Sequence, residues 1–275
     1  MPEGLKAGLN TYWRTFGAGP DPALLIHCGL GHSGSWAAIA RYLDTRLAMT
    51  AFDMPGHGRT AACESHVDVQ ELTALMGFDL LAAPAHVIGH SFGATVALRM
   101  AVMRSRMIRS LVLIEPVFFA AALHAGTEEK QQVETDMSGF ADAMERGDQQ
   151  EAARLFLGIW GNAGEWDTLT SQERARMGAK MHLIELQTPT LFEDKGHILD
   201  PNVLETLDVP VLLLRGARSP GSIAAIHASL ARRLPNVRSV VIEGAAHMAP
   251  VTHPAQVADQ ILAFLSSKQR APDQS

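Results

Sequence analysis

Short, continuous apolar runs recur along the chain, each followed by a longer stretch with helical character. In the first half these runs are ALLIHCG at 23–29, AMTAFD at 48–53, AHVIGH at 85–90 and SLVLIEP at 110–116. Two more come late in the chain, VPVLLLRG at 209–216 and VRSVVIEG at 237–244. Continuous rather than alternating apolarity is typical of strands that are covered on both faces. The sequence therefore predicts an α/β fold, with a mostly parallel sheet flanked by helices.

The alternation breaks in the middle of the chain, where helical signals replace the apolar runs. Two helix starts there have the pattern of capping boxes, Asp148 with Glu151 and Thr170 with Glu173. Because the strand pattern resumes afterwards with the same character, we expect an inserted helical cap on one α/β core rather than a second domain. The predicted division is a core of 1–116 and 206–275, a cap of 117–205 and a loose tail at 266–275.

The composition is that of an ordinary globular protein, since 47% of the 275 residues are hydrophobic and 19% are charged. The net charge of −6 gives no electrostatic reason to expect a nucleic acid or an anionic membrane as a partner. No apolar run reaches the length of about eighteen residues that a spanning helix needs, and the first residues lack a secretory pattern. Cys28 and Cys63 have neither disulfide-framework nor metal-site spacing, which favours a reducing compartment. We therefore expect a cytoplasmic protein; its oligomeric state stays open.

Ser91 lies in GHSFG at 89–93, directly after an apolar run and before a helical stretch. A sharp turn from strand to helix strains the residue at its tip, and bulky side chains two positions away would collide. Gly89 and Gly93 remove that collision. Although GxSxG alone occurs by chance, the strand before it and the helix after it are the context that a nucleophile requires. Ser91 is therefore predicted to be a nucleophile.

Together with GHSFG, three further stretches resemble the α/β-hydrolase family: HCGLGHSGSW at 27–36, DMPGHG at 53–58 and GAAHMAPVTHP at 244–254. The resemblance implies that the first stretch is the oxyanion loop and that the last carries the catalytic histidine, His247. The chemistry agrees, because a serine hydroxyl needs a general base, and His247 follows the last predicted strand in a loop of small residues. The other histidines show no HExxH or clustered metal spacing, so we expect neither a metal nor a cofactor.

The acid of the expected triad departs from the common pattern of the family. Ser219, in LLLRGARSPGS, stands where an aspartate is usual. An alternative position in the family is the end of the strand after the nucleophile's helix, and there the sequence has Glu115 in LVLIEP. A buried carboxylate is costly unless it is paired, and active sites gather at the carboxyl ends of such strands. Glu115 is therefore predicted to orient His247; the alternative is a structural salt bridge at the hinge of the cap.

The resemblance also implies two backbone N–H donors to an oxyanion, from Phe92 and from Gly29. Cys28 stands where the family usually has glycine, and as a nucleophile it lacks the turn around Ser91. Aromatic residues are candidates for the substrate pocket, although each could instead belong to the cap's own core. Those predicted to line it are Phe118, Phe119, Trp160 and Trp166, and Phe156 and Phe192 belong to the wider aromatic set.

These features predict a serine hydrolase that acts on a small, fairly apolar ester, thioester or lactone through an acyl-enzyme on Ser91. The small-molecule substrate is its expected partner. Serine at the turn argues against the relatives that use aspartate there, the haloalkane dehalogenases and epoxide hydrolases. Two alternatives remain: a hydrolase of carbon–carbon bonds with the same triad, and a non-catalytic sensor of a small ligand.

Overall fold

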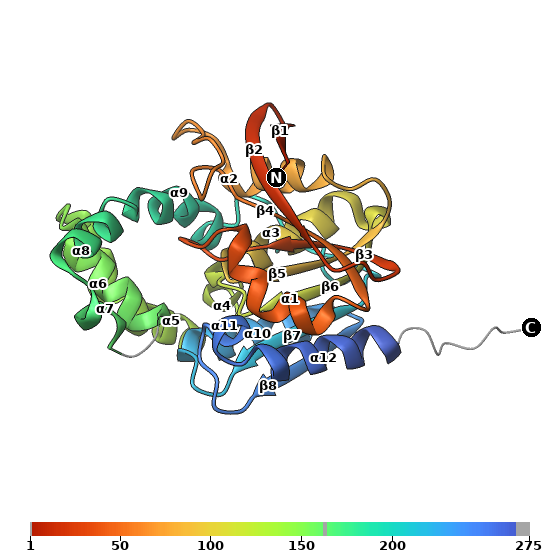
Figure 1. Cartoon of the computed structure of the whole chain (residues 1–275). Coiled ribbons are helices and arrows are strands. Elements are labelled where there is room, and N and C mark those ends of the chain that lie inside the picture. The colour runs from red at the N-terminus through yellow and green to blue at the C-terminus, as the bar shows by residue number, and fades with distance from the viewer. Residues whose placement is uncertain (1, 162–163, 268–275) are drawn as a thin grey trace, which may run out of the picture.

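The computed structural model describes residues 2–161 and 164–267 (Figure 1). In these residues one eight-stranded sheet has the strand order β1-β2-β4-β3-β5-β6-β7-β8. Its strands are β1 (Glu3–Lys6), β2 (Leu9–Phe16), β3 (Asp21–Ile26), β4 (Leu47–Phe52), β5 (Ala85–His90), β6 (Ile108–Ile114), β7 (Val211–Gly216) and β8 (Val237–Ile242). From β4 to β8 all neighbouring strands are parallel, whereas β1 pairs antiparallel with β2 and β2 antiparallel with β4. The predicted α/β class and mostly parallel sheet are confirmed.

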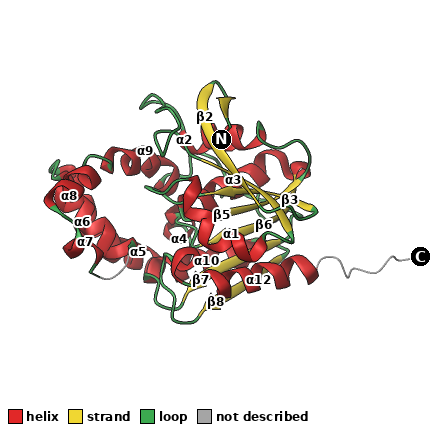
Figure 2. Ribbon diagram, viewed as in Figure 1, coloured by secondary structure: helices red, strands yellow, loops and turns green. Residues whose placement is uncertain are grey.

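Helices cover both faces of the sheet (Figure 2). One face packs against α2 (Val69–Phe78), α3 (Phe92–Arg104) and α10 (Gly221–Arg233), and the other against α1 (Ala37–Leu43) and α12 (Pro254–Ser267). Successive strand residues alternate between these two cores: in β6, Leu111 and Leu113 face the first and Val112 and Ile114 the second. Burial on both sides explains why the parallel strands are apolar throughout.

The segment between β6 and β7 is helical and lies to one side of the sheet (Figure 1). It contains α4 (Phe119–Leu123), α5 (Thr127–Glu145), α6 (Gln149–Trp160), α7 (Glu165–Thr168), α8 (Ser171–Gly178) and α9 (Met181–Phe192). A small separate core joins these helices through residues such as Phe140, Ala152 and Met181. The inserted helical cap is therefore present, although α4 packs against α10 and belongs to the main core.

The two predicted capping boxes have different outcomes. Thr170 and Glu173 form a complete box at the start of α8. Asp148 caps α6 by accepting from the Glu151 N–H, but the Glu151 carboxylate pairs with Arg154 instead of returning to the cap. The box predicted for Asp148 and Glu151 is therefore only half formed.

The hairpin of β1 and β2 was not predicted from the sequence. Its two turn residues, Ala7 and Gly8, have positive φ of 46° and 81°, which suits a two-residue hairpin turn. The predicted run at 23–29 also ends early, because β3 stops at Ile26 and the next residues leave the sheet. Of the predicted loose tail, 266–267 belong to α12, and 268–275 lie outside the described residues. The exact division into core and cap stays a prediction.

Candidate active site

Ser91 lies at the sharp turn between β5 and α3. Its backbone has φ 57° and ψ −119°, a strained conformation for a residue other than glycine. A Cβ on Gly89 would lie 2.2 Å from the Gly93 carbonyl oxygen, and one on Gly93 would lie 2.2 Å from the Ile26 carbonyl oxygen. Both glycines are therefore required by the close approach of backbone on either side of Ser91.

Replacing Gly93 by alanine is expected to lower the free energy of unfolding by about 3 kcal/mol, because the new methyl group would overlap rigid backbone. Denaturant titration measures the change. Gly158→Ala, inside α6, is the matched control, since a Cβ there would meet nothing within 4 Å. The control is expected to gain up to about 1 kcal/mol from helix propensity. Equal stability of the two variants would contradict the packing argument.

His247 lies in the loop after β8 and joins the other two predicted triad residues. Its Nε2 is 3.0 Å from the Ser91 Oγ, and its Nδ1 is 3.0 Å from the Glu115 Oε2. The side chains come from positions 156 and 132 residues away from it in the chain. His90, beside the serine, points away from it: its Nε2–H donates to the His247 backbone carbonyl at 2.9 Å and so helps to fix that loop.

Glu115 follows β6 directly and is fully buried, with a positive φ of 54°. One carboxylate oxygen faces His247, and the other accepts from the Gly216 N–H and the Ser219 hydroxyl, both at 2.5 Å. Burial alone would raise the pKa of this carboxyl, but the hydrogen bonds and charge of His247, with those two donors, outweigh it and lower the pKa. Glu115 therefore stays ionised, and Ser219, at the family's usual acid position, donates a hydrogen bond to this predicted acid.

The loop after β3 carries the predicted oxyanion donor Gly29, and buried histidines brace it. His27 accepts from the Met54 N–H through Nε2 and donates through Nδ1 to the Cys28 carbonyl at 2.8 Å. Burial raises the pKa of the Cys28 thiol to about 11, so this side chain stays a neutral thiol near pH 7. Gly29 and Ser91 both line one cavity, and Phe92 is the first residue of α3. The roles of the Gly29 and Phe92 N–H groups stay predictions.

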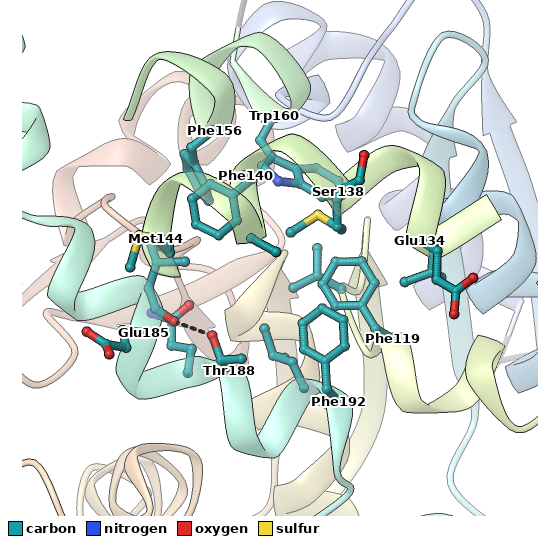
Figure 3. A pocket seen from close by; sticks show the side chains of 18 of the residues that line it. Phe119, Glu134, Ser138, Phe140, Met144, Phe156, Trp160, Glu185, Thr188 and Phe192 are labelled. Carbon is teal, nitrogen blue, oxygen red and sulfur yellow. Dashed lines mark hydrogen bonds between the residues drawn. The ribbon is translucent and has the colours of Figure 1, made fainter. Parts of the chain in front are cut away.

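A cavity of about 770 Å³ is lined by Gly29 and Ser91 and otherwise by residues of the segment between β6 and β7, several of which Figure 3 labels. Of the predicted pocket residues, Phe119 and Trp160 line it, and so do Phe156 and Phe192. The Trp160 ring meets the His247 ring edge-on with centroids 4.7 Å apart, so the cap contacts the predicted base directly.

The pocket assignment of Phe118 and Trp166 was wrong. Phe118 is 1% exposed and packs in the main core, because the chain turns into α4 at this residue. Trp166 packs against the cap's own small core, and the Arg174 guanidinium lies over its ring. The sequence analysis missed Met137, Phe140 and Met144, which line the cavity from one face of α5. Their i, i+3, i+7 spacing was the available signal.

A comparison with models of protein families shows which family the chain belongs to. The model described as "Alpha/beta hydrolase family" matches residues 23–260, which is most of the chain. The chain belongs to the alpha/beta hydrolase family. The match runs from β3, before the oxyanion loop, into α12 and so includes all three residues of the hydrogen-bonded Ser91, His247 and Glu115 group.

Curated relatives of this alpha/beta hydrolase include esterases. The chain is 29% identical over 266 residues to a pimeloyl-[acyl-carrier protein] methyl ester esterase of Methylococcus capsulatus, covering 94% of this chain and all of the relative. It is 23% identical over 251 residues to the (E)-2-((N-methylformamido)methylene)succinate hydrolase of Acinetobacter baylyi, covering 90% and 91% of the two chains. These relatives support the assignment of the chain as a hydrolase.

Solved structures share the fold of this alpha/beta hydrolase. A bacterial membrane phospholipase A superposes with a TM-score of 0.73 at 21% identity, over 98% of this chain and 86% of that one. A meta-cleavage product hydrolase from Pseudomonas fluorescens gives 0.66 at 18% identity, over 98% of both chains. At these identities the likeness concerns the fold alone.

Residues 2–161 and 164–267 contain neither a cluster of metal ligands nor a helix suited to cross a membrane. In these ranges no three His, Cys, Asp or Glu side chains gather closely enough to hold a metal ion. The helices within the same ranges do not combine the length and the apolar character that crossing a bilayer demands.

Proposed function

We propose that the protein is a serine hydrolase that cleaves a small, uncharged and largely apolar carboxylic ester through an acyl-enzyme on Ser91. The observation that carries the proposal is the continuous hydrogen-bonded chain from Ser91, which lines the cavity, through His247 to Glu115. Each residue has the environment that its role needs. Ser91 lies at a turn with a strained backbone, the His247 ring is hydrogen-bonded at both nitrogens, and the buried Glu115 carboxylate stays ionised.

The geometry supports the following sequence of steps. The Ser91 oxygen attacks the acyl carbon while its proton passes to the His247 Nε2, and the Glu115 carboxylate balances the charge of the imidazolium. The N–H groups of Phe92 and Gly29 stabilise the developing oxyanion. The alcohol leaves with the proton from Nε2, and a water that gives its proton to the same nitrogen then releases the acid.

The cavity favours an apolar and uncharged acyl group. Its walls include the aromatic rings of Phe119, Phe156, Trp160 and Phe192. Charged side chains also line it, and they are mostly acidic: Glu134, Asp142, Glu145 and Glu185, with Lys130. The ammonium of Lys130 lies 3.8 Å from the Glu134 carboxylate, so the remaining carboxylates would repel an anionic substrate. The relatives named as methyl ester esterases support an ester with a small alcohol group.

The test is turnover on a panel of p-nitrophenyl esters from acetate to octanoate, simple methyl esters, a thioester and a lactone. We expect hydrolysis well above the background set by Ser91→Ala, and a fluorophosphonate probe is expected to label the enzyme once, at Ser91, as located by peptide mass spectrometry. Absence of turnover together with a rise in melting temperature on adding an apolar ligand would indicate the sensor alternative. Turnover confined to carbon–carbon bonds next to a ketone would indicate the other alternative.

A further inference from the structure

Gln187 is a buried polar residue on the wall of the cavity. It lies in α9 of the cap, and only 3% of it is exposed. Among the described residues, and apart from the backbone hydrogen bonds of the helix itself, Gln187 uses only its backbone carbonyl, which accepts a hydrogen bond from the Thr190 hydroxyl. In the part of the chain that the structure describes, its carboxamide has no hydrogen-bond partner. One donor group and one acceptor therefore face the cavity unused.

The carboxamide lies against the predicted oxyanion loop. A Cβ placed on Gly29 would be 3.2 Å from the Gln187 Oε1 and 3.7 Å from its Nε2. Gly29 and Ser91 line the same cavity. Atoms of an acyl group bonded to Ser91, with its carbonyl oxygen directed at the Gly29 N–H, would thus lie beside this carboxamide.

The uncharged polar side chains that the cap adds to the wall beside Gln187 already have hydrogen-bond partners. The Thr188 hydroxyl donates to the Ile184 carbonyl, as the dashed line in Figure 3 shows, and the Ser138 hydroxyl donates to the Thr135 carbonyl. Leaving a buried amide unpaired is unfavourable, and buried polar groups normally have a partner. In an apolar pocket, a few unpaired polar groups are what fixes the orientation of a ligand.

We propose that the Gln187 carboxamide selects acyl groups that carry a hydroxyl on the second or third carbon. This inference rests on the proposed ester hydrolysis and names its substrate class. A hydroxyl can donate to Oε1 and accept from Nε2 at the same time, so one group satisfies both ends of the amide. The position follows from the closeness of the amide to Gly29: if the acyl carbonyl oxygen accepts from the Gly29 N–H, the carbon atoms next to that carbonyl are the ones nearest to the amide. Gln187 is a specificity-determining residue and takes no part in proton transfer.

The test compares kcat/KM for ethyl butyrate with that for both enantiomers of ethyl 2-hydroxybutyrate and ethyl 3-hydroxybutyrate, followed by acid release in a pH-stat. The native enzyme is expected to prefer one hydroxy ester to ethyl butyrate by at least tenfold. In Gln187→Met, which keeps the shape of the side chain and removes its hydrogen bonds, this ratio is expected to fall at least tenfold. Gln70→Met, at a buried glutamine of α2 outside the cavity wall, is the matched control and should keep the native ratio.

Four outcomes are possible, and they bear differently on this inference and on the proposed function. A native ratio near one, with all the esters hydrolysed, would overturn the role of Gln187 and leave ester hydrolysis intact. An equal loss on all esters in Gln187→Met, with a lower melting temperature, would show a structural role instead. No hydrolysis of any ester by the native enzyme would overturn both. A selective change of the ratio, with a melting temperature that is unchanged or higher, would support the inference, because removing an unpaired buried amide does not destabilise the fold.

Discussion

Glu115→Gln is expected to lower kcat on an ester substrate by about 10⁴-fold and to leave the fold intact, a magnitude typical of the same change at the acid of a serine triad. Two effects combine. The neutral amide does not balance the imidazolium that forms when His247 takes the serine proton. The Gly216 and Ser219 donors would also hold the amide oxygen, as they now hold Oε1, so the amide NH₂ would face the His247 Nδ1. That nitrogen would then accept, which leaves the proton on Nε2, where it blocks transfer from Ser91.

Ser219→Ala is the informative comparison for that variant. It removes one of the two donors to Oε1 but leaves the carboxylate, its charge and its contact with His247. A hydrogen bond to a charged group contributes roughly 1.5 kcal/mol, so we expect a loss of about tenfold. Single-turnover kinetics with far-ultraviolet circular dichroism as a check of folding would measure both variants. If the larger loss followed Ser219→Ala, Glu115 would not be the acid.

Ser91 could be predicted from a local rule, Glu115 from a local rule together with a position known in the family, and His247 mainly from the resemblance to the family. The glycines on either side of Ser91 reflect backbone contact at the turn, and an acidic residue at the end of a buried strand needs a partner. In a parallel sheet the carboxyl ends of strands meet at one edge, so residues far apart in sequence could be expected together. The structure brings Ser91, Glu115 and His247 together as expected, and their catalytic roles await the experiments above.

Features that depend on tertiary packing could not be read from the residues. The β1–β2 hairpin was missed because β1 has only four residues and the burial along β2 does not alternate regularly. Whether an aromatic side chain faces the cavity or a core depends on where each helix begins. For this reason Phe119 lines the cavity whereas its neighbour Phe118 packs in the main core. Gln187 carries no pattern of its own, and its importance comes from the unmatched amide beside Gly29.

Lowering the pH to about 5 is expected to bring the protein close to unfolding, because four buried histidines are held neutral. Burial lowers the pKa of His27 and His90 to about 3, and that of His57 and His227 to about 4. In the unfolded chain each histidine has its ordinary pKa of 6.5. At pH values between the folded and the unfolded pKa, the unfolded state binds more protons than the folded state, so the free energy of unfolding falls as the pH falls. At pH 5 each histidine accounts for about 2 kcal/mol of this loss, and the four together approach the whole stability of about 5–15 kcal/mol typical of a domain.

His227→Met tests this explanation at one site. Neither ring nitrogen of His227 has a hydrogen-bond partner in the described residues, so methionine removes the titration and breaks no contact of that kind. Denaturant titrations at pH 8 and pH 5 are expected to show a fall in stability between the two that is smaller by about 2 kcal/mol than in the native protein. His66→Gln, at a side chain that is 78% exposed, should leave the fall unchanged. An equal fall in the His227→Met and native proteins would mean that His227 is already protonated, or that its surroundings open to water, well above pH 5. His27, His57 and His90 would then have to account for the fall between pH 8 and pH 5, because the lowered pKa of Glu115 makes that residue lose stability only below about pH 4.5.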